Sequence, residues 1–125
     1  MLFRSSKRAK PEGMAAADWE RKRSAALAHG YYTAGIISFE KGVYVAADKN
    51  LRAAVPLIQG QPTMLAPALL YLGRANYQLA KMTLNKAKML EAAKFCEQSM
   101  AIPGPLQNDA RHDALVMKDE ASRMR

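Results

Sequence analysis

Apolar residues recur at three- and four-residue steps along most of the chain, which is the spacing of one face of an α-helix. The first such stretch includes Trp19 and Leu27 and continues up to Gly42. A glycine in that place is typical of the left-handed residue that follows a helix. Asp18 is a suitable N-cap, although the helix can also begin within residues 15–17. The pattern therefore predicts a long first helix that ends at Gly42.

Four further helices are predicted by the same spacing, and loop-forming residues separate them. Pro56 ends the second helix near Val55, because proline lacks a backbone donor and restricts the residue before it. Pro67 is tolerable only in the opening turn of the third helix. The expected spans are residues 43–55, about 63–82, about 86–101 and about 106–123. No segment alternates like a strand, so the predicted fold class is all-α with about five helices.

The chain divides by composition into a short arm and one helical domain. Residues 1–14 hold charge, Ser, Pro and Gly without a sustained period, and we expect a flexible basic arm there. The domain spans residues 15–125, with a first helical hairpin over 15–60, a second over 61–104 and a capping helix over 105–125. Gly104 lies between two prolines and marks the second of these boundaries.

An internal repeat relates the two predicted hairpins. Gly35 aligns with Gly73 and Phe39 with Tyr77, at an offset of 38 residues. In the second helix of each pair the offset is 45 residues, so the second hairpin holds extra residues near its turn. The aligned set there is Ala47, Leu51 and Ala54 with Ala92, Cys96 and Ser99. Small residues at matching places let paired helices approach closely, while Leu51, Phe39 and Tyr77 fill the space between them.

This arrangement resembles the tetratricopeptide repeat, whose unit is two antiparallel helices. The run Tyr71-Leu72-Gly73-Arg74-Ala75-Asn76-Tyr77 is similar to the core of the family's first helix. Gly42-Val43-Tyr44, followed by Ala47, Leu51 and Ala54, is similar to its turn and second helix. The resemblance covers roughly residues 24–104. It implies a short right-handed solenoid of two repeats that is closed by a capping helix.

The resemblance also implies a concave face, made by the first helix of each hairpin, that binds a peptide or a helix. Rings, aliphatic groups and a single Arg lie on it, so capture of an acidic chain terminus is not expected. An alternative left open is that Phe39 and Tyr77 are wholly interior. The implied partner-binding residues are His29, Tyr32, Ile36, Phe39, Leu70, Arg74, Tyr77 and Gln78, with Glu40 beside them.

Charge adds a second functional hypothesis. The formal net charge is +8, and residues 1–25 carry seven basic side chains against three acidic ones. Such a segment can meet nucleic acid or an anionic surface, or it can be a solvated tail. Few aromatic residues accompany these side chains, so single-strand stacking is not favoured. The basic residues are Arg4, Lys7, Arg8, Lys10, Arg21, Lys22 and Arg23.

Catalytic and metal-binding chemistry finds little support in the sequence. Cys96 is the only cysteine and falls on an apolar stripe, where a small core residue is expected. His29 and His112 stand on different predicted helices. Asp109, His112 and Asp113 could hold a metal, but adjacent charges on an end helix usually form a solvated face. We therefore expect a protein that is not an enzyme and has no cofactor.

The remaining expectations concern partners and location. Neither a signal peptide nor an 18-residue apolar stretch occurs, so the chain as given is expected to be cytoplasmic without a membrane span. The eight methionines are spread over several helices, as core filling or as an adaptable apolar face. Two repeats are fewer than such arrays normally need. A protein or peptide partner, a larger assembly or a homo-oligomer, including head-to-tail stacking through open ends, is expected.

Overall fold

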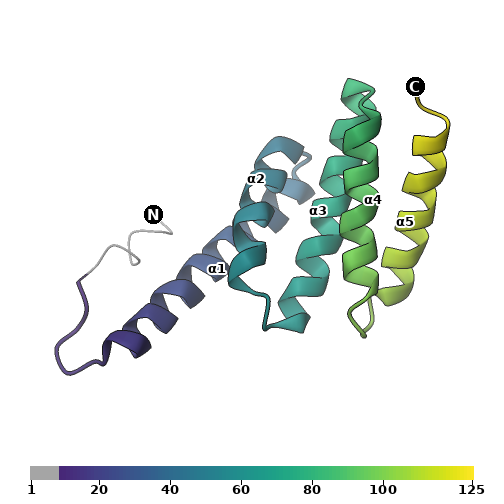
Figure 1. The fold of residues 1–125 in the computed structure, drawn as a ribbon. Coiled ribbons are helices and arrows are strands. Elements are labelled where there is room, and N and C mark those ends of the chain that lie inside the picture. Colours follow the sequence, from purple (N-terminus) through teal and green to yellow (C-terminus); the bar gives the residue numbers. More distant parts are fainter. Residues whose placement is uncertain (1–8) are drawn as a thin grey trace.

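The structure, a computed structural model, describes residues 9–125. Within that range the chain is helical and contains no strand, which confirms the predicted all-α class (Figure 1). A single 3-10 turn, η2, follows the second helix. The elements are α1 (Ala16–Glu40), α2 (Tyr44–Ala54), η2 (Val55–Leu57), α3 (Pro62–Thr83), α4 (Lys86–Met100) and α5 (Gln107–Ser122).

The helices pack mainly against their neighbours in the sequence: α1 with α2, α2 with α3, α3 with α4 and α4 with α5. Successive helices run in alternating directions, so the C-terminal ends of α1, α3 and α5 point the same way (Figure 1). The first half of α1 projects beyond α2. Its exposed residues there have no other helix to cover them.

Most helices begin and end near the residues that the sequence predicts, because capping and turn-forming residues stand there. Gly42 has φ 76°, the left-handed conformation expected after the first helix. Asn85 caps α4, because its side chain accepts a hydrogen bond from the backbone N–H of Lys88 at 3.0 Å. The predicted cap Asp18 is wrong. The helix begins earlier, at Ala16, so that Asp18 lies within the first turn and pairs with Arg21.

The prediction that Pro67 lies in an opening turn also fails. The third helix starts at Pro62, which takes the first-turn place, and Pro67 is inside the helix. A proline there removes the backbone donor that would serve the carbonyl four residues earlier. That carbonyl belongs to Thr63, which is exposed to solvent. Water can therefore take the place of the missing donor.

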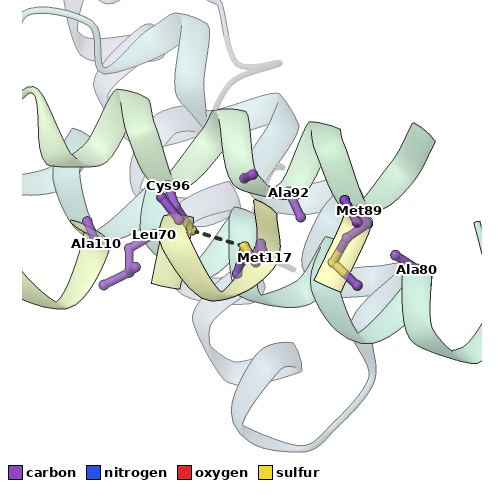
Figure 2. Close-up of a cluster of buried hydrophobic side chains, with 10 residues drawn as sticks. Leu70, Ala80, Met89, Ala92, Cys96, Ala110 and Met117 are labelled. Carbon is purple, nitrogen blue, oxygen red and sulfur yellow. Dashed lines mark hydrogen bonds between the residues drawn. The ribbon is translucent and has the colours of Figure 1, made fainter. Parts of the chain in front are cut away.

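Buried side chains form two clusters, one on each side of α3. One gathers around Leu51, Ile58 and Leu72 and joins α1, α2 and α3. The other joins α3, α4 and α5 and is unusually rich in alanine. Small side chains bring these helices close together, and Met89 and Met117 fill what space remains (Figure 2). Residues that α5 contributes at helical spacing are Ala110, Ala114, Met117 and Ala121.

Two of the buried glycines, Gly35 and Gly73, lie where the helices of a hairpin approach closely. A Cβ atom added to Gly35 would lie 2.5 Å from Cγ of Leu51 on α2. One added to Gly73 would lie 2.5 Å from Sγ of Cys96 and 3.0 Å from the carbonyl oxygen of Ala92, both on α4. Leu51 and Cys96 are the residues that the repeat alignment pairs. The structure thus places the same contact at the same position in both hairpins.

A polar network around the buried side chain of Asn76 joins the first hairpin to the second. Asn76 of α3 is 0% exposed, and its amide donates to Asp48 of α2 at 2.8 Å. Arg52 of α2 donates to the same carboxylate at 2.9 Å and to Glu91 of α4 at 2.9 Å. Lys88 approaches the Asn76 oxygen at 3.4 Å. No buried side-chain polar atom of the described residues lacks a hydrogen bond. Hydrogen bonds are directional, so this network fixes the orientation of α2 relative to α3 and α4.

Replacing Gly35 or Gly73 by alanine should destabilise the fold. Gly73→Ala and Gly35→Ala should each lower the free energy of unfolding by about 1–3 kcal/mol, because the helices must separate to admit the methyl group. Gly60→Ala is the matched control, since nothing lies within 4 Å of the added atom. It should change stability by no more than about 0.5 kcal/mol in urea unfolding. Equal stability of all three variants would contradict the close approach.

Candidate functional site

A hollow lies between α1, α3 and α5. Its volume is about 290 Å³. Apolar walls come from Phe39 on α1 and from Val116 and Met117 on α5, and polar groups come mainly from α3 and α5. We call this hollow the groove. Its lining residues are Phe39, Arg74, Tyr77, Gln78, His112, Asp113, Val116 and Met117.

The polar groups of the groove are already paired across α3 and α5. Arg74 Nε donates to Asp113 Oδ2 at 2.6 Å, and this ion pair is partly buried. The Tyr77 hydroxyl donates to Glu120 Oε1 at 2.6 Å. That hydrogen bond, together with burial, raises the pKa of Tyr77 above its usual value. Since Arg74 has its own carboxylate, the groove carries little charge with which to attract a free one.

Aromatic contacts hold the α1 wall of the groove in place. The ring of Phe39 lies 5.1 Å from that of Tyr71 and 5.7 Å from that of Tyr44, measured between centroids. The Arg74 guanidinium lies 5.7 Å from the Tyr71 ring centroid. Edge-to-face ring pairs and cation–π contacts of this kind add directional preference to apolar burial. The groove is therefore walled by side chains with fixed orientations.

Four of the eight sequence-predicted binding residues come together here: Phe39, Arg74, Tyr77 and Gln78. Phe39 and Tyr77 are half-buried, so the alternative that they are wholly interior is wrong. The other predicted residues lie outside the groove lining. His29 is exposed elsewhere on α1, while Tyr32 and Ile36 are half-buried against the cluster between α1 and α3.

Leu70 is a clear correction to the predicted set. It is 1% exposed and belongs to the cluster that includes Ala110 and Ala114 of α5. The resemblance placed Leu70 on the open inner side of α3. In this chain α5 packs against that part of α3 and covers it. A partner cannot reach Leu70 while α5 is in place.

The sequence reasoning missed the α5 wall of the groove. His112, Asp113, Val116 and Met117 stand at helical spacing on one side of α5, and that spacing was the available signal. In the sequence, His112 and Asp113 stand beside Asp109 as a possible metal-binding set. No cluster of three His, Cys, Asp or Glu side chains suited to a metal occurs within residues 9–125. Asp113 instead pairs with Arg74.

The lone thiol, Cys96, is a core group. Cys96 is fully buried, and its Sγ lies 3.6 Å from Sδ of Met117 (Figure 2). Burial, with a smaller contribution from the nearby Asp113 carboxylate, raises the pKa of the thiol to about 12. A nucleophilic cysteine needs the opposite shift, because the thiolate is the reactive form. The position suits packing and not covalent chemistry.

Part of the basic arm falls outside the described residues, namely Arg4, Lys7 and Arg8. Lys10 and Lys22 are exposed. Two further basic residues have acidic neighbours on the same helix: Arg21 pairs with Asp18, and Arg23 pairs with Glu20 at 3.0 Å. Exposed pairs of this kind contribute little stability, but each compensates one positive charge. The first half of α1 is therefore less basic than a count of Lys and Arg suggests.

Among residues 9–125, none of the helices combines the length and hydrophobicity that a bilayer crossing requires. A comparison of the chain with protein-family models, with curated proteins and with solved structures finds no match in any of the three. The groove itself is therefore the basis for assigning a function.

Cys96 should resist alkylation in the folded protein. At pH 8 a thiol with a pKa of about 12 reacts about a thousandfold more slowly with iodoacetamide than an ordinary thiol whose pKa is about 8.5. Because folding raises this pKa, the thiol's contribution to stability is complete below the unfolded pKa and is lost as the pH rises through the folded one. Mass spectrometry measures the rate, with urea-unfolded protein as the control. Labelling at the unfolded rate would contradict the burial.

Proposed function

We propose that this protein is a non-catalytic interaction module that binds a peptide or helix in the groove between α1, α3 and α5. The observation that carries the proposal is the groove's composition. The groove has an apolar part that can receive an anchor side chain of the partner, made by Phe39, Val116 and Met117. Hydrogen-bonded polar groups lie beside it and can fix the orientation of the partner. A fixed apolar hollow with a few oriented polar groups binds a ligand with little loss of conformational freedom.

The predicted tetratricopeptide-like character supports this reading. In the proposed solenoid α1 and α3 are the first helices of two repeats, and α5 occupies the place of a third. Gly35 and Gly73 make equivalent contacts with the second helix of their hairpins. A groove lined by successive first helices is the surface that such arrays use for extended partners. The α5 helix then serves both as cap and as one wall.

The chemistry of the groove narrows the class of partner. Arg74 and Tyr77 are already bound to Asp113 and Glu120, so a terminal carboxylate would have to displace an internal acceptor. A neutral apolar or aromatic anchor has no such competitor. It gains from burial against Val116 and Met117. We therefore propose a peptide or helix that inserts an apolar side chain, and not one that presents an acidic terminus.

Two other expectations remain predictions. Two features favour self-association through open ends. Ile37 on α1 is among the exposed large apolar residues, and no other helix covers the first half of α1. Nucleic-acid binding by the basic arm is weakened by the ion pairs of Arg21 and Arg23. Neither surface includes residues of the groove, so both can be tested separately from it.

Blocking the groove should abolish peptide binding without unfolding the protein. Peptides selected from a random phage library on the full chain should bind Val116→Arg at least about tenfold more weakly, because an arginine would fill an apolar wall with charge. Leu115→Arg is the matched control, since Leu115 is exposed on α5 but does not line the groove. It should bind as the original protein does. Fluorescence anisotropy of labelled peptides measures both affinities.

Two results would contradict the proposal. One is a selection that enriches no peptide. The other is a set of enriched peptides that binds Val116→Arg and Leu115→Arg equally well. Circular dichroism melting of both variants separates a blocked groove from a misfolded protein, because both arginines replace exposed side chains and should leave the melting temperature almost unchanged.

A further inference from the structure

The turn between α3 and α4 exposes large apolar side chains at one end of the molecule. Leu84 is 85% exposed, Met82 is 72% exposed and Leu90 is 47% exposed. The turn forms the tip of the second hairpin, at the end where α5 also finishes (Figure 1). None of residues 82–90 lines the groove. An isolated exposed leucine is ordinary on a protein surface, but these three exposed side chains fall at the end of α3, in the turn and in the opening turns of α4.

Leu84 also adopts a backbone conformation that leucine disfavours. Its φ is 50° and its ψ is 45°, in the left-handed region where glycine or asparagine usually ends a helix. It is the only residue other than glycine with positive φ in the described part of the chain. Its backbone N–H completes the end of α3. A glycine would make the same turn without strain, so the leucine side chain adds nothing to the stability of this turn.

Positive charge surrounds this tip. Lys81 and Lys86 flank the turn and are exposed, whereas Lys88 approaches the Asn76 oxygen at 3.4 Å. No Asp or Glu occurs anywhere in residues 49–90. Lys86 and Leu90 are four residues apart on α4, which places both on one side of that helix. Lys81 lies 4.9 Å from the Tyr77 ring centroid. The Glu91 carboxylate is paired with Arg52, and the Glu120 carboxylate accepts the Tyr77 hydroxyl.

We infer that the α3–α4 turn docks on the surface of an anionic lipid bilayer, with Leu84 and Met82 inserted between headgroups and the lysines against phosphate. A protruding apolar tip needs a partner that can receive it without a shaped pocket, and the bilayer interface is fluid. The lysines match a negatively charged leaflet. Apolar insertion and basic attraction together provide the two signals that stable peripheral binding requires.

Other partners fit the tip less well. Nucleic acid would meet the lysines, but residues 81–90 contain no aromatic ring on which a base could stack. It also offers no apolar phase for Leu84 and Met82. An acidic protein would need a shaped apolar pocket of its own. This inference is independent of the proposed groove, because none of the tip residues lines it.

Vesicle co-sedimentation of the full chain tests the inference. The protein should bind vesicles of phosphatidylcholine mixed with phosphatidylglycerol and should not bind phosphatidylcholine alone. Added NaCl should weaken the binding. Leu84→Gly should reduce affinity about tenfold, because it removes the inserted side chain. Lys81→Gln and Lys86→Gln should each reduce it about fivefold.

Matched controls separate docking from general stickiness and from misfolding. Leu115→Ala and Lys22→Gln remove an exposed apolar group and an exposed charge away from the tip, and both should bind as the original protein does. Leu84→Gly should melt at the same temperature or higher, because glycine relieves the backbone. Lower membrane affinity with undiminished stability is the expected signature.

Several outcomes would overturn the inference. One is no binding to anionic vesicles. Another is equal binding by Leu84→Gly and the original protein. A third is binding lost on replacing Arg4, Lys7 and Arg8 by Gln but kept in Leu84→Gly, which would assign attachment to the basic arm. A fourth is Leu84-dependent binding to single-stranded RNA or to polyglutamate that is tighter than binding to vesicles.

Discussion

The close approach of paired helices at Gly35 and Gly73 is the constraint on which the rest of this structure depends. At each position a neighbouring side chain, Leu51 or Cys96, occupies the space that a Cβ atom would need. Around Gly73, where α3 meets α4, the neighbouring core is correspondingly rich in alanine. The separation and orientation within each hairpin follow from that fit.

The two hairpins are then fixed to each other by polar and apolar contacts with different roles. Ile58, Leu69 and Leu72 supply non-directional burial between them. Asn76 and Arg52 supply direction, because their hydrogen bonds to Asp48 and Glu91 have one satisfactory geometry. These contacts fix the orientation of α3 about its own axis. They therefore also set the positions of the groove residues on the other side of α3, which face α1 and α5. The groove is thus a consequence of packing on the far side of the same helix.

Much of the fold could be predicted from the sequence because its determinants are local or repeated. Helical spacing, Gly42 and the prolines between helices give the elements, and the matched glycines give the contact within each hairpin. Asn76 could not be assigned, because its partner Asp48 is 28 residues away and no local pattern connects them. Leu84 could not be recognised either, since its sequence neighbours contain no glycine that would signal a left-handed turn.

Only the part of the candidate site on α1 and α3 could be predicted, because the part on α5 also depends on contacts between residues far apart in the sequence. Residues on α1 and α3 follow from the repeat, whereas α5 lies outside it and its docking depends on three-dimensional packing. That packing buries Leu70, which the repeat alone would leave open, and adds Val116 and Asp113 to the groove. A capping helix therefore changes which residues are accessible as well as protecting the core.

A double-mutant cycle between Gly73→Ala and Cys96→Ala tests the central claim most directly. If the added methyl group meets the Cys96 sulfur, removing that sulfur should restore part of the stability that Gly73→Ala loses, with a coupling energy of about 1 kcal/mol or more in urea unfolding. Additive losses, with no coupling between the two positions, would show that the helices do not meet there and would contradict this account.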